Sequence, residues 1–420
     1  MEELKQEIIS SIENHILDID HKNYASLIDV LGQQAVEKLS FYLESEQKEK
    51  FSSYLKELIE EKKDIRSALK KLFEKPISKD IISKDFDLSM KEGETCTIFY
   101  GTNREPNNKN DLTEGYGNER STQLRLGSCL VSIPSERTKG QTKGSLWQKI
   151  INFDASYGDI QIKTPMEYIK DEYWQKISRL LAPLEPEEKQ ALIFIHGFNT
   201  SFEEAAMRAT QISVDLEHSG ITAFFSWASK GSPLSYISDS ATVQYSEKHL
   251  TEFLTDFAKN SGAKRIHIIA HSMGNRALLE AVNRICRENP NIKFGQIILA
   301  AADVDADVFE ELSHAYSKIS EQTTLYTSKK DKAVGMSKWL HSHNRAGFTP
   351  PVCVVQNINT IEVEEEVNLL ELGHGYFSQH QSLLKDMQKL IKFNLDANNR
   401  EKLQLQKANY HNQYWKIKGE

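Results

Sequence analysis

From residue 191 onward, short apolar runs alternate with helical stretches, and this alternation constrains the fold more than any other feature of the sequence. Runs that are apolar throughout are typical of strands buried on both faces. Strands that alternate with helices favour a parallel sheet covered by helices on both sides. The expected strands are 191–195, 222–226, 266–270, 296–300 and 323–327, and the expected helices include 202–218, 245–260 and 381–393. We therefore predict an α/β fold with a mostly parallel sheet.

Upstream of residue 191, β-rich runs at 96–100 and 150–153 are joined by turn-rich links such as TNREPNNKND. Links of this composition suit tight turns, so we predict an antiparallel start to the same sheet. Residues 93–395 are accordingly assigned to one α/β domain. The polar residues 396–420 are expected to form a peripheral helix or a loose tail.

Residues 1–75 have a different texture, with no proline and a single glycine. Apolar residues recur there every three or four positions, which places them on one helix face. These residues include Leu4, Ile8, Ile12, Ile16 and Ile19. We predict a small α-helical bundle that serves as an interaction or recruitment domain for a protein partner. Residues 76–92 lose the helical period and are expected to form a linker.

Composition excludes several classes of function. The 420 residues carry a net charge of −8. Proteins that bind the phosphate backbone of nucleic acids usually carry a net positive charge, so we expect no nucleic-acid partner. The four cysteines form no CxxC pair, so neither a disulfide framework nor a thiolate zinc site is expected. No run of 18 apolar residues and no apolar segment at the N-terminus is present, so we expect a cytoplasmic protein without a transmembrane segment.

The segment RIHIIAHSMGNRALLEAV, residues 265–282, predicts a nucleophile at Ser272. An apolar strand ends, a sharp turn follows, and a helical period begins, which is the context of a nucleophile elbow. The strand and the helix approach closely at such a turn, so small residues are needed two positions before and after the serine. Ala270 and Gly274 meet that need. The alternative is that Ser272 only caps a helix.

The segment ALIFIHGFNTSFEEAA, residues 191–206, supplies a candidate oxyanion hole. Loops at this position lend a backbone N–H to the oxyanion. We expect the N–H groups of Phe198 and Met273 to be the two donors, with Gly197 allowing close approach of the backbone. The alternative is an ordinary loop in which Thr200 or Ser201 caps the next helix.

A serine nucleophile needs a base and an acid that orients the base, in the chain order Ser, Asp/Glu, His. Asp331 follows an apolar strand, and His374 lies between two glycines. These two complete the predicted triad with Ser272. Asp303 is the alternative acid, and the rival bases are His341, His343 and His380. The motif HSHN, at 341–344, lacks a carboxylate cluster, so we expect no metal and no other cofactor.

Residues beside these strand ends are expected to shape a substrate pocket, because ligands bind outside the carboxyl ends of parallel strands. We assign this role to His196, Gly197, His271, Trp227 and Tyr236. The polar segment 228–245 is interpreted as a loop able to act as a lid or a substrate wall. The alternative is a polar connection that carries a structural tryptophan.

The segments IFYGTNRE, NERSTQLRLGSCLVSIPSERTKG, HGFNTSFEEAA, FSWAS, IIAHSMGNR, LAAADVDADVF, LYTSKKDKAV and LGHGYF occur in this order. Together, over about residues 94–395, they resemble the bacterial esterase/lipase-like α/β-hydrolase family of unknown function. The resemblance implies an α/β-hydrolase fold and a serine hydrolase triad, but no defined natural substrate. The family usually has a proline before the aspartate where this chain has Ala302. Many members begin with an export-type N-terminus; here we expect the helical domain of residues 1–75 in its place.

The expected activity is hydrolysis of carboxylic esters through an acyl-enzyme intermediate, with a small-molecule or lipid ester as substrate. An amidase or peptidase would use the same triad, and it would fit an effector in a bacterial defence system. A non-catalytic binding protein built on a hydrolase scaffold is the third hypothesis.

Overall fold

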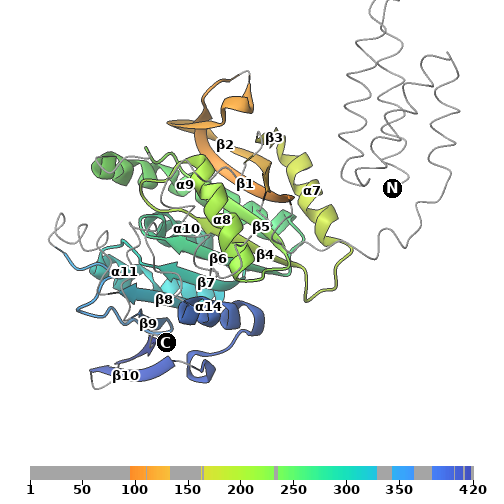
Figure 1. Ribbon diagram of the computed structural model, residues 1–420. Coiled ribbons are helices and arrows are strands. Elements are labelled where there is room, and N and C mark those ends of the chain that lie inside the picture. Colours follow the sequence, from red (N-terminus) through yellow and green to blue (C-terminus); the bar gives the residue numbers. More distant parts are fainter. Residues whose placement is uncertain are drawn as a thin grey trace, which may run out of the picture. The chain divides into compact units, whose positions relative to one another are not determined.

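The computed structural model describes residues 95–109, 111–132, 162, 165–230, 235–328, 343–363, 381–401, 403–409 and 412–417. All of them belong to the unit Asp87–Glu420 (Figure 1). The bundle predicted for residues 1–75, the linker 76–92 and the strand 150–153 lie outside the described residues.

An 11-stranded sheet forms the centre of this unit, with the strand order β10-β11-β9-β8-β7-β6-β4-β5-β1-β2-β3. The strands are β1 Thr95–Pro106, β2 Tyr116–Ser132, β3 Met166–Tyr168, β4 Gln190–Ile195, β5 Ile221–Ser226, β6 Arg265–His271, β7 Phe294–Ala300, β8 Ser320–Ser328, β9 Asn359–Val363, β10 Leu403–Asn409 and β11 Asn412–Ile417. In this spatial order, every neighbouring pair from β11 to β1 is parallel. The remaining strands, β2, β3 and β10, are antiparallel to their neighbours. The predicted parallel sheet with an antiparallel start is confirmed.

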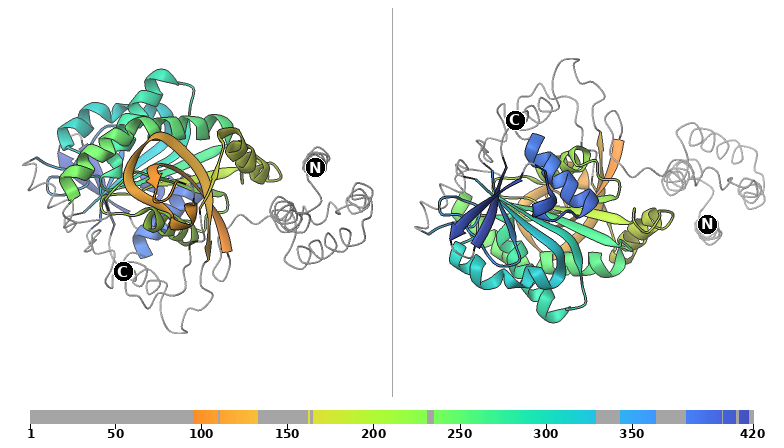
Figure 2. Two further views of the ribbon diagram at one scale, coloured as in Figure 1. Left: turned by 90° about the horizontal axis from the view of Figure 1, so that it is seen from above. Right: turned by 90° about the horizontal axis from the view of Figure 1, so that it is seen from below.

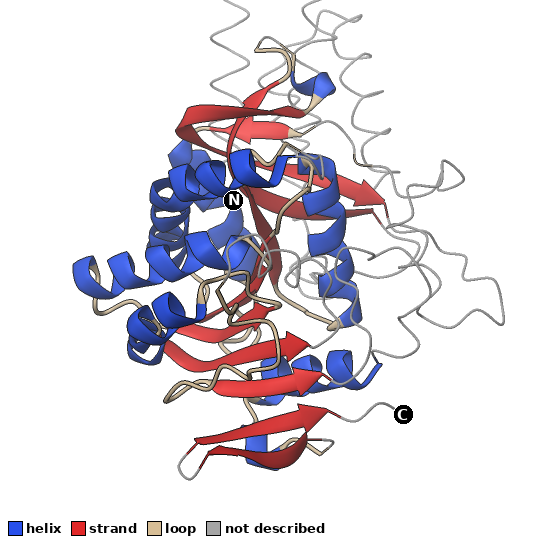
Figure 3. Ribbon diagram, turned by 90° about the vertical axis from the view of Figure 1, so that its left-hand side faces the viewer, coloured by secondary structure: helices blue, strands red, loops and turns tan. Residues whose placement is uncertain are grey.

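Helices cover both faces of the sheet (Figures 2 and 3). The α-helices are α7 Lys170–Leu181, α8 Phe202–Asp215, α9 Tyr236–Asn260, α10 Gly274–Glu288, α11 Ala306–Leu312, α12 His314–Ile319 and α14 Gln381–Phe393, and the 3-10 helices are η1 Leu112–Glu114 and η3 Ala397–Asn399. α8 and α14 bury apolar side chains on one face, and α9, α10 and α12 pack together on the other. No described helix is long and apolar enough to cross a membrane.

The central strands are buried on both faces, which is why they are apolar throughout. Every residue of β5 and all but the first residue of β4 are buried. Burying apolar surface contributes about 25 cal/mol per Å², so this double-sided core is the main stabilising term of the domain. Because β4 to β9 run parallel, the loops that follow them meet at one edge of the sheet. That edge is where a ligand site is expected.

The C-terminal segment is not the tail or peripheral helix that its polarity suggests. Residues 403–417 form the β10–β11 hairpin, and β11 pairs in parallel with β9. Trp415 and Ile417 of β11 are buried, whereas Tyr414 and Lys416, which point to the other face, are only partly buried. A strand that is fully buried on one face alone shows alternation in place of an apolar run, and in a polar sequence this alternation is easily missed.

The segment 228–245 is mostly helix, not a long loop. α9 begins at Tyr236 and continues for 25 residues. Its first turns bury Asp239, Thr242 and Ser246, along with Tyr236 and Val243. Most of these buried positions are polar. The helical spacing of apolar residues, from which the sequence analysis predicted the helix, begins only later in α9, and so the predicted start at residue 245 was too late. The interpretation of residues 236–245 as a loop is therefore wrong.

Candidate active site

Ser272 lies in the turn between β6 and α10, at the centre of the sheet, with φ of +47°. This left-handed conformation costs a non-glycine residue roughly 1–2 kcal/mol. Three backbone hydrogen bonds hold it. The N–H of Ser272 donates to the carbonyl of Ala300 at 3.0 Å, and its own carbonyl accepts from the N–H groups of Asn275 at 3.1 Å and Asp303 at 3.2 Å. The strand–turn–helix arrangement predicted around Ser272 is present.

The close approach of strand and helix at the turn requires glycine at position 274. A Cβ atom there would lie 2.4 Å from the carbonyl oxygen of His196, so Gly274 cannot be replaced without moving the backbone. Asn275 reinforces the turn from the helix side. Its Nδ2 lies 3.2 Å from the carbonyl of Ala270 and 3.0 Å from that of Ser272. Sequence reasoning missed Asn275, because a helix-initiating asparagine carries no signal of its own.

The loop between β4 and α8 lies against the nucleophile. A Cβ atom on Gly197 would lie 2.9 Å from the Cβ of Ser272, so the loop backbone is in contact with the serine. Ser201 is the N-cap of α8 and forms a capping box with Glu204. Within the described part of the chain, neither the N–H of Phe198 nor that of Met273 has a hydrogen-bond acceptor. Two unused donors therefore lie on segments that flank Ser272.

His196 fixes the orientation of the peptide that carries the Phe198 N–H. Its Nδ1 lies 2.8 Å from the carbonyl oxygen of Gly197, and its Nε2 accepts from the N–H of Trp227 at 3.1 Å. Burial holds the pKa of His196 well below its usual range, so the ring is neutral with the proton on Nδ1. In a trans peptide the carbonyl and the N–H point in opposite directions. The Phe198 N–H is therefore directed away from the His196 ring.

His196 and Trp227 support the loop instead of lining a pocket. Both side chains are fully buried, and their rings stack with centroids 5.0 Å apart. The indole Nε1 of Trp227 donates to the carbonyl of His196 at 2.9 Å. Every polar atom of the two rings is thus engaged within the protein, and the two side chains hold the loop in place.

His271 and Tyr236 lie next to the proposed oxyanion donors. A Cβ on Gly197 would lie 2.8 Å from Nδ1 of His271. Burial, aided by the nearby Arg208 cation, lowers the pKa of His271 to about 3, so this ring is a poor general base at neutral pH. The Tyr236 ring packs edge-on against Phe198, with centroids 5.3 Å apart.

Asp303 is buried within a cluster of cationic and phenolic groups. Its Oδ2 accepts from the hydroxyl of Tyr236 at 2.6 Å and from Nη2 of Arg276 at 2.8 Å. Its Oδ1 lies 3.5 Å from Nε of Arg345. Nε of Arg276 also donates to the carbonyl of Asp303 at 2.6 Å. Arg276 and Arg345 were not predicted, because the ion pairs join segments that are far apart in sequence.

The other predicted triad members, Asp331 and His374, lie outside the described residues, as do the rival bases His341 and His380. β8 ends at Ser328, just before Asp331, and α14 begins at Gln381, shortly after His374. In sequence, the expected acid therefore follows β8 closely, and the expected base precedes α14 closely. The described residues contain no group of three or more His, Cys, Asp or Glu side chains able to hold a metal ion.

A strained serine between a central parallel strand and the following helix, with a glycine loop against it, is the arrangement of α/β hydrolases. Residues 174–392, just over half of the chain, match the family described as alpha/beta hydrolase of unknown function, DUF900. The chain belongs to this family. No curated protein matched the sequence.

Three of the similar solved structures come from different organisms. A predicted CIB-like hydrolase from Thermoplasma acidophilum is 19% identical, with 50% of this chain and 90% of that chain covered and a TM-score of 0.29. A lipase-esterase related protein from Clostridium acetobutylicum is 13% identical, with coverage of 50% and 95% and a TM-score of 0.28. The Pyrococcus furiosus esterase Pf2001 is 14% identical, with coverage of 42% and 74% and a TM-score of 0.24.

Proposed function

We propose that this protein is a serine hydrolase that cleaves carboxylic esters, lipid esters included, through an acyl-enzyme at Ser272. The observation that carries the proposal is the left-handed turn at Ser272, with Gly197 packed against it. Maintaining a strained backbone at a serine is typical of a functional site, since a helix cap alone needs no such conformation. The two unused N–H groups beside Ser272 supply the donors that acyl transfer needs.

In the proposed reaction, His374 removes the hydroxyl proton of Ser272 as its Oγ attacks the ester carbonyl carbon. The carbonyl electron pair moves to oxygen, and the N–H groups of Phe198 and Met273 stabilise that oxyanion. Collapse of the tetrahedral intermediate breaks the ester C–O bond, and the leaving alkoxide takes the proton from His374. A water molecule then attacks the acyl-enzyme in the same way, which releases the carboxylic acid and restores Ser272.

Asp331 remains the proposed acid of the triad, ahead of Asp303. The acid must stabilise the imidazolium that forms on the base, and it does so by its negative charge. Arg276 and Arg345 both lie at ion-pair distance from Asp303, so they offset much of that charge. Asp303 is better suited to hold Arg276 and Tyr236 in place beside the nucleophile.

Labelling with a fluorophosphonate probe, together with turnover of p-nitrophenyl esters of short and long acyl chains, tests the function. We expect wild type to be labelled and Ser272→Ala to lose both labelling and turnover. His374→Ala should lose at least about 10³-fold in kcat/KM, because the nucleophile then lacks its base. A wild-type protein that neither labels nor turns over any ester would contradict the proposal.

Isosteric variants separate the two candidate acids. Asp331→Asn should lower kcat by about 10²–10⁴-fold, because the amide cannot stabilise the imidazolium. Asp303→Asn should lower it by less than about 10-fold, with its larger effect on thermal stability, because it removes the buried carboxylate that pairs with Arg276 and Arg345. The reverse order of the two kcat values would assign the acid to Asp303.

A further inference from the structure

The loop that carries the proposed oxyanion donor contains a second strained residue. Asn199, directly after Phe198, has φ of +54°. Asparagine tolerates the left-handed region better than most residues, but it still prefers other conformations. A strained residue persists only where its surroundings over-determine it. We therefore looked for the side chains around loop 197–200 that hold Asn199 in this conformation.

Thr200 connects this loop to three other segments. It is fully buried, and all of its polar atoms are engaged. Its hydroxyl donates to the carbonyl of Phe198 at 3.1 Å and accepts from Nη1 of Arg208 at 3.2 Å. Its N–H donates to Oγ of Ser229 at 3.2 Å, and its carbonyl accepts from Nη2 of Arg104 at 2.7 Å. The threonine thereby ties the loop to β1, to α8 and to the segment after β5.

Asp239, in the first turn of α9, supports the same loop through Ser229. It is fully buried and accepts from the hydroxyl of Ser229 at 2.6 Å and from the N–H of Lys230 at 3.0 Å. The Oγ of Ser229 in turn accepts from the N–H of Thr200. Burial raises the pKa of Asp239, and the nearby N–H of Asn199 opposes that shift. Asp239 thus acts on the loop through Ser229, whereas Thr200 bonds the Phe198 carbonyl directly.

Arg104 supplies the buried positive charge that complements Asp239. Besides Thr200, its guanidinium donates to Oγ of Ser226 at 2.8 Å, to the carbonyl of Ser229 at 3.1 Å and to the carbonyl of Gly117 at 2.9 Å. Ser226 in turn lies 3.3 Å from Nε2 of His196. The guanidinium therefore bonds loop 197–200 through Thr200 and the segment after β5 through Ser229. It also bonds Ser226, which lies beside the His196 ring that orients the Gly197 carbonyl.

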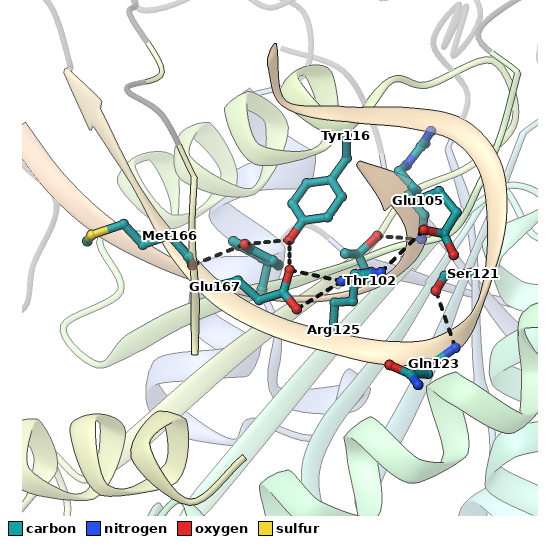
Figure 4. Close-up of polar contacts among 10 residues, drawn as sticks. Thr102, Glu105, Tyr116, Ser121, Gln123, Arg125, Met166 and Glu167 are labelled. Atoms are coloured by element: carbon teal, nitrogen blue, oxygen red, sulfur yellow. Dashed lines mark hydrogen bonds and ion pairs between the residues drawn. The ribbon is translucent and has the colours of Figure 1, made fainter. Parts of the chain in front are cut away.

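An irregularity in the β1–β2 ladder accounts for the inward direction of Arg104. The register shifts between Thr102 and Arg104, and again between Arg104 and Pro106. Shifts of this kind re-aim a side chain. The irregular stretch is braced by Arg125, which pairs with Glu105 at 3.2 Å and with Glu167 on β3 at 3.0 Å (Figure 4). The irregular β1–β2 hairpin thus directs the Arg104 side chain toward loop 197–200.

We propose that Thr200, Asp239 and Arg104 are positioning residues for ester hydrolysis, which hold loop 197–200 so that the Phe198 N–H faces the reacting oxygen. The proposal rests on the hydrolase function proposed above. None of the three needs to touch substrate. Their effect is on the transition state, because a donor displaced by a fraction of an ångström stabilises the oxyanion less while substrate binding is little changed.

The sharpest test compares Thr200→Val with Thr200→Ser in the full chain. Valine keeps the shape and removes the hydroxyl, and serine keeps the hydroxyl. Kinetics with p-nitrophenyl butyrate and the Ki of an alkyl boronic acid, which forms a tetrahedral adduct on serine, are measured together. We expect Thr200→Val to lower kcat about 10–100-fold with KM within about 2-fold, and to raise the boronate Ki by a similar factor. Thr200→Ser should restore most of both.

Thr210→Val is the matched control, since Thr210 is a buried threonine of α8 whose hydroxyl, among the described residues, bonds just the helix carbonyl of Ala206, at 2.9 Å. It should lower the Tm without changing kcat. Asp239→Asn gives an independent reading if Thr200→Val does not fold, with the same loss of kcat and the same rise in boronate Ki. Unchanged kcat in the folded variants, or a loss that Thr210→Val shares, would overturn the proposal.

Fluorophosphonate labelling of wild type keeps the two proposals apart. Labelled, active wild type with unaffected Thr200 and Asp239 variants would overturn only the positioning role. Wild type that is neither labelled nor active would overturn the hydrolase function and the positioning role together.

Discussion

At the scale of single residues, three of the six described non-glycine residues with positive φ lie beyond the carboxyl ends of adjacent strands. These are Asn199, Ser272 and Ala301, which follow β4, β6 and β7 respectively. Ser272 and Ala301 are held by hydrogen bonds from other segments; the Ala301 N–H, for example, donates to the carbonyl of Tyr326 at 3.1 Å. Strain placed at the carboxyl ends of adjacent strands is the mark of a built site.

Gly197→Ala is expected to abolish most activity without unfolding the protein. The new methyl would lie 2.8–2.9 Å from His271 Nδ1 and Ser272 Cβ, so the loop or the serine must move. We expect kcat/KM to fall by at least about 10²-fold, because an oxyanion donor and the nucleophile are separated. Ester kinetics and the Tm are measured on the same preparation. Activity within a few-fold of wild type would show that this loop does not form the oxyanion hole.

What the sequence reveals about single residues depends on how local their contacts are. Ser272, Gly197 and Gly274 were predictable, because a strand, a sharp turn and a helix adjacent in sequence specify them. Arg104 and Asn275 were not, since their roles arise from backbone groups brought together only by the fold. That the side chains of His196 and Trp227 support a loop was not predictable for a related reason: a polar side chain at a strand end either faces a ligand or supports a loop, and the sequence does not distinguish the two.

At the scale of elements, the prediction worked where apolar periodicity is strong. The doubly buried strands and α14 are located correctly, whereas the start of α9 and the β10–β11 hairpin are not. α9 begins with a turn that buries Asp239 in a polar network, and β11 buries only alternate side chains. In both, the tertiary setting determines the structure more than the local apolar pattern.

The contact between α9 and α10 includes an unfavourable pair of charges. Burial raises the pKa of Glu247 to about 7, and the like charge of Glu280 adds to the shift. Because the folded pKa lies above the unfolded one, this group destabilises the fold increasingly as pH rises from about 4.5 through 7. Glu247→Gln should therefore stabilise the protein at pH 8 by about 1 kcal/mol, after allowance for solvent screening, and should have no effect at pH 4.

Urea unfolding of wild type and Glu247→Gln across this pH range checks the expectation. A stability difference that is the same at pH 4.5 and pH 8 would mean that the charge on Glu247 is not responsible.

At the scale of the whole molecule, the domain buries several neutral histidines. Burial lowers the pKa of His267 to about 3 and that of His218 to about 4. Both folded pKa values lie below the ordinary value of about 6.5, so the stability that they contribute is complete above pH 6.5 and is lost as pH falls toward 4. Between pH 6.5 and 5, each histidine should lower the free energy of unfolding by roughly 1–2 kcal/mol.

Replacing His267 by glutamine isolates this effect, because glutamine retains an acceptor for the N–H of Gln296, which lies 3.1 Å from Nδ1. The variant should lose less stability than wild type between pH 6.5 and 5, as measured by urea unfolding at each pH. Parallel curves for the two proteins would contradict the assignment to His267.

Sequence and structure agree on the class of the α/β domain. The resemblance noted from ordered motifs is confirmed by the family match over residues 174–392 and by the strand arrangement around β6. Asp331, His374 and the role of residues 1–75 stay predictions. Ser272 is therefore the central residue of the proposed hydrolase: its strained turn lies within the described residues, and its role as nucleophile is the proposal.

Mapping the fluorophosphonate adduct by peptide mass spectrometry tests that claim most directly. We predict a single stoichiometric adduct on the peptide that contains Ser272, absent from Ser272→Ala and blocked by a boronic acid. An adduct on any other residue, or none on a folded wild-type protein, would contradict the assignment of Ser272 as the nucleophile.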